Sequence, residues 1–411
     1  MKDKLKKVFS LTTYIIINLI YILVGAILVK YKIINQLYYS YGYILFAIIN
    51  IILFIILLVR RKYKRNIIDI FLLLIIIFGI ISTIFTHSTN TALFGTYGRN
   101  EGLFAICYYI SLLFISGFVK KEDRKLIIYS ILVLGIIHCI YGFCQAFDLF
   151  NVKVSYHKGA KFINGFTTNP NFFATLMLIC ITYAIGLYTI AKDTEEQIIY
   201  LVLIFLFYTG MLLSNTLSVF VGLYGIMILL LIYCIKHKYI KKYIILVSIL
   251  LTTTLFIHFV GLTTIVSDLL KTKDETVEIS KGNIDGNYGT GRIEVWKTTI
   301  KVIPKYLLHG VGIDNFIHIN NGGPIVRKGA MYDKAHNEYL QILATMGIFS
   351  LLSYIALHFL IIKKSWKYMK NKEIYLLLPI ISYLIQAQFN ISVIEVAPIF
   401  YIGLGLCINR K

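Results

Sequence analysis

Residues 67–85 read IIDIFLLLIIIFGIISTIF, a stretch in which Asp69 is the single charged side chain. An α-helix rises 1.5 Å per residue, so about 20 apolar residues are enough to cross a hydrocarbon layer roughly 30 Å thick. In that layer every backbone polar group must be satisfied within the segment, which favours a helix. The stretch therefore predicts a transmembrane helix, and the rest of the chain decides how many others accompany it.

Similar runs recur throughout the 411 residues, of which 58% are hydrophobic, and the mean hydropathy is +0.76. This is far more apolar than a soluble globular protein. We predict an all-α integral membrane protein with about twelve transmembrane helices. The first run is too long for a cleaved signal peptide, and the weakest boundary is the turn at 214–216. The runs are 8–29, 43–59, 67–85, 103–119, 126–147, 171–191, 198–213, 217–235, 243–261, 337–362, 374–388 and 393–408.

The formal net charge of +21 reflects membrane topology rather than nucleic-acid binding. If the N-terminus is inside, the inner loops carry 25 of the 41 Lys and Arg residues, the short outer loops carry 6 and the long loop carries 10. Short cytoplasmic loops of membrane proteins are enriched in Lys and Arg. We therefore predict that both termini are cytoplasmic and that the long loop is extracytoplasmic.

The chain divides into a membrane domain of nine spans (1–261), an extracytoplasmic loop (262–335) and three further spans (336–411). The loop is the one large polar stretch, and it lies between the ninth and tenth spans. Residues 268–287 are polar and rich in Gly, Asp and Lys, which predicts irregular structure.

Residues 290–308 have the pattern of an amphipathic helix. Apolar side chains follow helical spacing at Ile293, Trp296, Ile300, Ile303 and Leu307, and lysines follow on a neighbouring face at Lys297, Lys301 and Lys305. Such a helix suits a membrane interface. Pro304 should bend it or end it early, and Gly310 is a stop signal.

Arg292 and His336 are the loop residues best suited to chemistry on a polar, anionic substrate. A guanidinium grips a diphosphate through parallel hydrogen bonds without a metal, although Arg292 could instead only reach lipid phosphate. A histidine with a pKa near 6.5 can accept a proton from a hydroxyl nucleophile, although His336 could be an ordinary interfacial histidine. Eleven residues at 100° each place Gly347 within about 20° of His336 on one helix face, where glycine would let a neighbouring helix approach.

Two shorter outer segments carry further candidates. Arg99 and Glu101 stand at the head of the fourth run, where they could pair with each other or bind substrate. Asn169 is a predicted N-cap, and Pro170 is the predicted first helical residue of the sixth run.

The remaining polar residues narrow the chemistry. The loop before the sixth run is basic, which indicates an anionic ligand; its charged residues are Lys153, His157, Lys158 and Lys161. Glu395 lies in the last run, where a carboxylate is costly and is usually functional or paired. The six cysteines lie inside runs without CxxC spacing, and we find no nucleotide or metal motif, so no metal or cofactor is expected.

These residues resemble the bacterial O-antigen ligase and O-antigen polymerase superfamily. The similarity covers roughly residues 94–350, and its most specific element is the His336-Asn337 pair, followed by nine residues and then Gly347. Asn215 departs from the pattern because many members have Arg there, and Ser350 stands where many ligases have a second Gly. The other matching stretches are 291–296, Pro304 with Gly310-Val311-Gly312, 335–340 and, more weakly, 98–102 and 165–171.

The resemblance implies a metal-independent glycosyltransferase with a GT-C-like helical fold in the bacterial plasma membrane. Its donor would be a glycan on undecaprenyl diphosphate, and its acceptor a glycan, lipid or protein hydroxyl. Arg292 would hold the diphosphate, His336 would activate or orient the acceptor hydroxyl, and Arg99 would be a second diphosphate contact. We predict that substrate-binding residues are Arg99, Glu101, Asn169, Asn171, Trp296 and Asn337.

Other functions remain open. A polytopic transporter or lipid-linked-glycan flippase would need no large outer loop and should show two similar halves. We find neither that symmetry nor a transporter signature around residues 60–65. A non-catalytic membrane scaffold would make the Arg292 and His336 pattern a coincidence. Within the transferase hypothesis, polymerase, ligase and protein glycosylation are all compatible with the sequence.

Overall fold

The structure is a computed structural model of the whole chain. It describes residues 10–60, 66–152, 154–157, 160–283, 285–286, 288–320, 322–327, 330–370, 372–408 and 410. Most described residues are helical, and two short antiparallel hairpins, β1–β2 and β3–β4, are the strands among them. The predicted all-α membrane class is confirmed at this level.

The elements follow one another in this order. The helices of the apolar runs are α2 (Leu11–Lys30), α3 (Gln36–Val59), α4 (Ile67–Ile84), α6 (Leu103–Ser116), α7 (Arg124–Ala146), α8 (Pro170–Ile190), α9 (Thr194–Leu213), α10 (Leu217–Lys236), α11 (Ile240–Phe259), α14 (Glu338–Ser365), α16 (Leu378–Gln386) and α17 (Ala397–Ile408). The connecting elements are α5 (Thr89–Phe94), β1 (Ser155–His157), β2 (Ala160–Phe162), α12 (Ile265–Ser280), α13 (Arg292–Tyr306), β3 (Ile325–Arg327), β4 (Ala330–Tyr332) and α15 (Lys367–Lys370). The 3₁₀ turns are η1 (Lys121–Asp123), η2 (Leu149–Asn151), η3 (Tyr288–Gly291), η4 (Phe316–His318), η5 (Ile374–Leu376) and η6 (Ala387–Phe389).

Each of the twelve predicted apolar runs contains a helix. Within the described part of the chain, nine helices are long and apolar enough to cross a membrane, and three shorter apolar segments are Leu103–Ser116, Ile374–Phe389 and Ala397–Ile408. The twelve-span count therefore stays a prediction, because these three segments fall short of the length that a full crossing needs.

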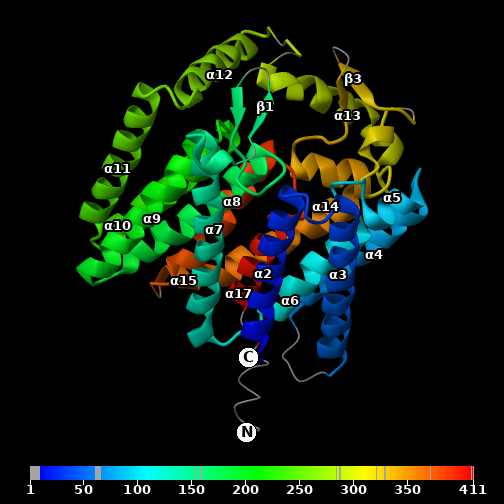
Figure 1. Ribbon diagram of the computed structural model, residues 1–411. Helices are drawn as coiled ribbons and strands as arrows, with labels where there is room; N and C mark the ends of the chain where they lie inside the picture. The colour runs from blue at the N-terminus through cyan, green and yellow to red at the C-terminus, as the bar shows by residue number, and fades with distance from the viewer. Residues whose placement is uncertain are drawn as a thin grey trace.

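The bundle is organised around α8, which is buried along nearly its whole length. It packs against α7, α9, α10 and α16, while α6 packs between α3 and α17. Asn169 caps α8 and Pro170 is its first residue, as predicted. Figure 1 shows that α12, α13 and the hairpins lie at one end of the bundle, whereas α2 begins and α17 ends towards the opposite end.

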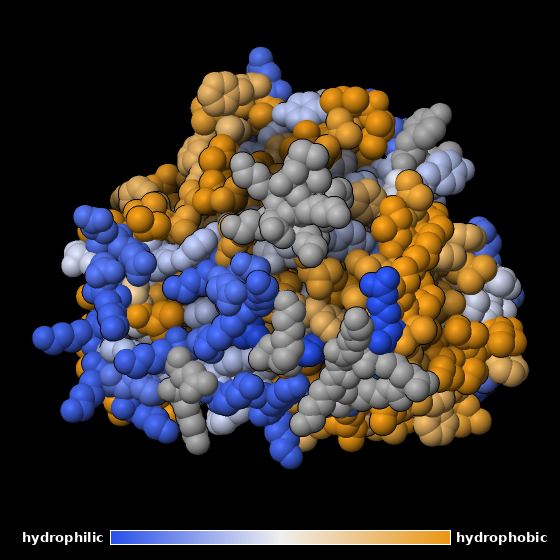
Figure 2. Space-filling view, turned by 90° about the horizontal axis from the view of Figure 1, so that it is seen from below, coloured by the Kyte–Doolittle hydropathy of each residue, from blue (hydrophilic) through white to orange (hydrophobic). Residues whose placement is uncertain are grey.

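Figure 2 views the molecule from the end opposite to α12 and α13. Hydrophilic side chains gather on the left of this face, and hydrophobic side chains cover its right-hand side. The lysines of the α10–α11 connection belong to this end, since α11 runs from there towards α12 (Figure 1), and Lys236, Lys238 and Lys241 are exposed. The wide apolar surface on the flanks suits lipid contact.

Asp69, the single charged residue of the stretch 67–85, is paired. Its carboxylate lies 2.5 Å from Arg410 Nη1, and both side chains are buried. The backbone N–H of Arg410 also donates to Gly117 O at 2.8 Å. A buried carboxylate is tolerated when a cation accompanies it, so this pair joins α4 to the segment that follows α17.

The long loop is more regular than the sequence predicts. We expected irregular structure over 268–287, but α12 is helical from Ile265 to Ser280, so that prediction is wrong over most of its length. Val266, Leu270 and Val277 share helical spacing among charged residues. Polar composition hides this pattern, because a surface helix needs only a few apolar positions.

The predicted interfacial helix is confirmed as a helix. It is α13, and it ends two residues after Pro304. Its buried face consists of Val295, Thr299 and Val302, which pack on a small core beside the main bundle. Ile300, from the predicted apolar stripe, is 61% exposed. Leu307 of the stripe is exposed as well, whereas Trp296 of the same stripe packs against Phe389, so the stripe faces away from the protein only in part. Its place at a membrane interface stays a prediction.

A break in α14 shapes the segment around it. Gly347 has φ +80 inside this helix, so the predicted alignment of Gly347 with His336 on one continuous face is wrong. The break frees backbone carbonyls, which accept from the N–H groups of Val311 and Gly312 at 2.9 and 3.1 Å. The carbonyl oxygen of Leu308 would lie 2.5 Å from a Cβ at position 347. The glycine thus admits a loop backbone rather than a neighbouring helix.

Candidate active site

Asp314 binds to residues from segments that are far apart in the chain. The N–H and the hydroxyl of Thr96 both donate to its Oδ2, at 2.6 and 2.8 Å. Its Oδ1 pairs with the ammonium of Lys334, whose side chain is 5% exposed. A neighbouring contact links Ser88 N–H to Asn315 Oδ1 at 3.1 Å. Because a buried ion pair is stable only when both partners stay in place, these segments hold one arrangement.

Arg99 reaches across this junction. Its Nη2 donates to Asp333 Oδ2 at 2.8 Å, and both side chains are partly exposed. The possible Arg99–Glu101 pair is therefore not the arrangement seen. Glu101 instead accepts a hydrogen bond from the hydroxyl of Tyr109 at 2.5 Å. The two residues, neighbours in the sequence, serve different parts of the site.

The backbone on either side of His336 is held by hydrogen bonds. The indole N–H of Trp296 donates to Ala335 O at 2.8 Å, and Asn337 Oδ1 caps α14 by accepting from Leu340 N at 2.9 Å. His336 itself has φ +51, which L residues rarely adopt. Strain of this kind persists where surrounding contacts impose it, often at functional sites. Substrate contacts by Trp296 and Asn337 remain predictions.

Three cations surround the imidazole of His336. Burial, together with the charges of Arg292, Arg99 and Lys334 and against the charge of Asp333, lowers the pKa of His336 to about 4. Burial also lowers the pKa of Arg292, which remains charged because its ordinary value is about 12.5. We call Arg99, Arg292 and Lys334, with the neutral His336 among them, the cationic cluster. The structure thus brings together the three residues to which the sequence assigned the chemistry.

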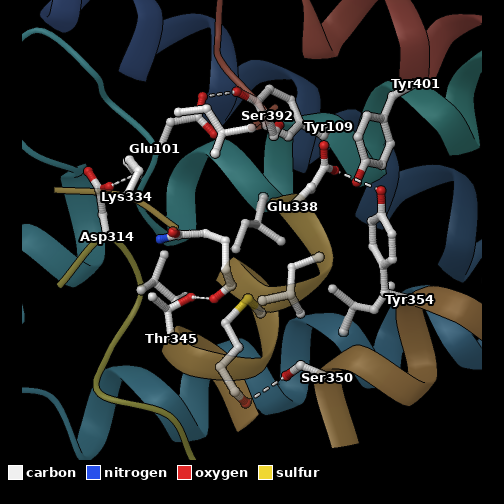
Figure 3. A pocket seen from close by; sticks show the side chains of 17 residues that line it. Glu101, Tyr109, Asp314, Lys334, Glu338, Thr345, Ser350, Tyr354, Ser392 and Tyr401 are labelled. Carbon is white, nitrogen blue, oxygen red and sulfur yellow. Dashed lines mark hydrogen bonds and ion pairs between the residues drawn. The ribbon is translucent and has the colours of Figure 1, made fainter. Parts of the chain in front are cut away.

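A pocket lined by carboxylates lies beside this cluster (Figure 3). Its acidic residues are Glu101, Asp314 and Glu338, and Lys334 also lines it. Glu338 is buried at the start of α14 and accepts from Tyr354 at 2.7 Å. Burial raises the pKa of Glu101 to about 7, while the charge of Lys334 opposes the rise. We call this cavity the carboxylate pocket; neither Arg99 nor Arg292 is among its lining residues.

The loop before α8 approaches the same region through Glu395. The carboxylate of Glu395 accepts from Thr168 N at 3.2 and 3.3 Å, and Arg99 and Lys30 act on it electrostatically. Of the two alternatives for this costly carboxylate, functional or paired, the structure shows a backbone partner, and a functional role stays open. Asn169 uses its side chain to accept from Asn171 N at 2.9 Å. A substrate-binding role for these two asparagines stays a prediction.

Part of the predicted basic loop lies outside the described residues, namely Lys153 and Lys158. Lys161 pairs with Asp148 and donates to Ala146 O at 3.0 Å, so its charge is partly compensated within the protein.

The two departures from the family pattern have structural roles. Asn215 has φ +51, and its Oδ1 accepts from the Thr263 hydroxyl and from Thr264 N, both at 2.9 Å. It therefore joins the α9–α10 turn to the start of the long loop. Ser350 lines the carboxylate pocket and donates to Met346 O at 3.0 Å.

Four charged residues of the site were not predicted from the sequence: Asp314, Asp333, Lys334 and Glu338. Lys334 and Glu338 flank the His336-Asn337 pair, and this proximity is the signal that could have found them. Asp314 follows the Gly310-Val311-Gly312 turn, but nothing in the sequence predicts its contact with Lys334. Within the described residues, no three His, Cys, Asp or Glu side chains gather as a metal site.

Comparison with known proteins found one matching family. Residues 201–355 match the family model described as O-Antigen ligase, a stretch that includes Arg292, Trp296 and His336. No curated protein matches the chain. The long apolar helices and this match together indicate a multi-pass membrane protein. The resemblance read from the sequence is thereby confirmed over residues 201–355, and the match supports a protein of the O-antigen ligase family.

Proposed function

We propose that this protein transfers a glycan from undecaprenyl diphosphate to an acceptor hydroxyl on the outer face of a bacterial plasma membrane. One observation supports the proposal: Arg99 and Arg292, which come from distant segments of the chain, both act electrostatically on His336. The Arg99–Asp333 contact alone spans 234 positions of the chain. The family match supports this class of reaction over transport.

The cationic cluster has the chemistry to hold a diphosphate. Arginine presents a rigid fork of N–H donors that matches phosphate oxygens, and its charge persists on partial burial. Arg99 and Lys334 are partly offset by Asp333 and Asp314, so Arg292 supplies most of the net positive charge that acts on His336, where the leaving group would gain negative charge. Such fixed charge stabilises the transition state without a metal ion.

The transfer step follows from the neutral state of His336. Its free ring nitrogen accepts the proton of the acceptor hydroxyl as the hydroxyl oxygen attacks the anomeric carbon of the donor. The bond from that carbon to the diphosphate oxygen breaks, and undecaprenyl diphosphate leaves with the electron pair. Arg292 and Arg99 hold the charge that this bond cleavage releases. The proton on His336 then passes to solvent.

The membrane side is inferred from the arrangement of the loop. The long loop and both hairpins lie at one end of the bundle, and the lysine-bearing α10–α11 connection lies at the other. The positive-inside rule assigns the lysine-rich end to the cytoplasm. The cationic cluster would then face the compartment in which lipid-linked glycans are joined to their acceptors.

The test is the mass profile of polyprenyl-diphosphate-linked glycans in cells that carry the wild-type protein or His336→Ala. We expect the variant to accumulate lipid-linked glycan, as single repeats for a polymerase and as long chains for a ligase. Exposed His258→Ala is the matched control and should leave the profile unchanged. An unchanged profile for His336→Ala, with the variant present in the membrane, would refute its assigned role.

Sidedness separates a transferase from a flippase. In intact spheroplasts, a membrane-impermeant lectin should label the glycan that accumulates with His336→Ala, because transfer is blocked after the glycan has reached the outer face. Accumulation of glycan that the lectin cannot reach would contradict the transferase proposal and favour transport.

A further inference from the structure

The proposed transfer leaves the carboxylate pocket without a task. The pocket is walled by tyrosines as well as acids, and Figure 3 shows Tyr109, Tyr354 and Tyr401 grouped with Glu338. Tyr109 is buried on α6 and stacks on Tyr401 with ring centroids 5.3 Å apart. Aromatic rings beside carboxylates offer both a flat apolar face and hydrogen-bond acceptors.

The charges inside the pocket are unbalanced. Asp314 is paired with Lys334. Glu338 instead accepts from two hydroxyls, of Tyr354 at 2.7 Å and of Tyr383 at 3.2 Å. Glu101 accepts from the hydroxyl of Tyr109 at 2.5 Å. Two carboxyl groups therefore face the cavity with hydroxyls, rather than cations, as their hydrogen-bond donors.

This composition selects the chemistry of a ligand. Carboxylate oxygens accept hydrogen bonds from hydroxyl, amino or amide groups, so they suit a sugar ring. A ligand carboxylate or phosphate would meet like charge at short range, which is strongly unfavourable in a partly buried site. The pocket therefore admits uncharged polar rings and rejects anionic ones, which is the opposite preference from that of the cationic cluster.

The position of the pocket assigns it to one substrate. Lys334 acts on both His336 and Glu101, so the pocket adjoins the cluster. Neither Arg99 nor Arg292 lines it, so the pocket is set apart from the predicted diphosphate contacts. In a displacement at the anomeric carbon, the acceptor approaches from the side opposite to the diphosphate. The acceptor is thus the substrate that fits here.

We propose that the carboxylate pocket binds a sugar ring of the glycan acceptor, a ring that presents hydroxyl or amide hydrogens and carries no anionic group. The inference rests on the proposed transferase function, because the sugar ring is an acceptor only in a transfer reaction. Glu101 would accept hydrogen bonds from that ring, and the tyrosines would pack against its apolar face.

The protonation of Glu101 gives the inference a distinctive pH dependence. Burial raises the pKa of this carboxyl to about 7, with Lys334 and Tyr109 opposing the rise and Asp314 and Glu338 adding to it. Rejection of an anionic sugar should therefore strengthen as pH rises through about 7 and Glu101 becomes charged. A uronide stays anionic across this range, so the change comes from the protein.

The experiment uses the detergent-solubilised full chain and saturation-transfer NMR. The probes are two matched pairs, methyl glucoside with methyl glucuronide and methyl galactoside with methyl galacturonide. We expect wild type to bind at least one uncharged sugar and to prefer it over its uronide by about tenfold or more at pH 8.5. The preference should be smaller at pH 6.

Glu101→Gln keeps the shape of the side chain and removes its charge. In this variant the uronide should bind more strongly than it does to wild type, and the preference should lose the part of its pH dependence that Glu101 contributes. Glu195→Gln, an exposed change in the first turn of α9, is the matched control and should behave as wild type.

The outcomes separate this inference from the proposed function. If no uncharged sugar binds, or if uronides bind equally well at pH 8.5, the pocket assignment is wrong even where His336→Ala accumulates lipid-linked glycan. If uncharged sugars bind with the expected pH dependence while the lipid-linked glycan profile never changes, the pocket is a sugar site and the transferase proposal fails.

Discussion

The cationic cluster and the carboxylate pocket lie side by side and share Lys334, yet they carry opposite charge. The cluster gathers Arg99 and Arg292 around a neutral histidine, whereas the pocket gathers Glu101 and Glu338 under tyrosine hydroxyls. In a membrane protein each of these charges is costly to bury alone. The separation of the two regions indicates a divided site, in which the cationic cluster suits an anion and the carboxylate pocket suits an uncharged polar ring.

The largest loss of stability is expected from breaking the Asp314–Lys334 ion pair, which lies between the two regions. Asp314→Asn leaves the buried ammonium of Lys334 without its counter-charge and weakens the anchor of Thr96. Removal of one partner of a buried pair costs about 3–5 kcal/mol. The midpoint of unfolding in detergent, with urea as denaturant, should fall accordingly.

A second change sharpens this result. Lys334→Met added to Asp314→Asn should recover much of the lost stability, because it removes the unpaired charge. Equal stability of the single and double variants would show that Asp314 acts through Thr96 alone.

The next largest effect is on the rate of transfer, and it concerns the cationic cluster alone. Arg292→Gln removes a fixed positive charge from the position of the leaving diphosphate, so transfer should slow by about 10²–10³-fold. Arg292→Lys keeps the charge but loses the planar fork, so its loss should be smaller. The rate is measured with reconstituted protein and lipid-linked glycan isolated from cells carrying His336→Ala. A normal rate in Arg292→Gln would remove this arginine from the mechanism.

The break in α14 can be tested by stability. Gly347→Ala would force an L residue to φ +80 and place its Cβ 2.5 Å from Leu308 O, so the loss should exceed the roughly 1–2 kcal/mol of backbone strain alone. Gly261→Ala is the matched control, with φ +76 and open space around it. If the two variants unfold at the same temperature, the close approach at Gly347 contributes nothing.

The smallest effect is on the pH dependence of stability, and it reports on the pocket. The folded pKa of Glu101 is raised from an ordinary value of 4.5 to about 7. Its contribution to stability is therefore complete below about pH 4.5 and is lost as pH rises through about 7. Thermal unfolding between pH 5 and 8 should show a decrease on the order of 1 °C that becomes smaller in Glu101→Gln. An identical decrease in the variant would contradict the assigned burial.

The cluster was predictable from the sequence and the pocket mostly was not. Arg99, Arg292 and His336 lie in polar segments between the apolar runs, where a charged residue is easily recognised. Glu338 looks like an ordinary acid in the first turn of a helix, where acids are favoured for local reasons. Its contacts with Tyr354 and Tyr383 depend on the packing of α14 against the rest of the bundle, which one sequence does not reveal.

The fold divides in the same way. The apolar runs predict the positions of the nine helices long enough to cross a membrane in the described part of the chain, because length and hydropathy are local properties. The break at Gly347 escaped because the residues around it form an unbroken apolar pattern, and the interruption depends on hydrogen bonds from Val311 and Gly312. Helix α12 escaped because its few apolar positions are diluted by charges.

The most direct test of the divided site is the affinity of the purified protein for undecaprenyl diphosphate. Arg292→Gln should weaken binding by about tenfold or more, since a hydrogen bond between charged groups contributes roughly 1.5–3 kcal/mol. Glu101→Gln, in the neighbouring pocket, should bind as tightly as wild type. Undiminished binding by Arg292→Gln, or an equal loss in both variants, would contradict the assignment of the anion to the cationic cluster.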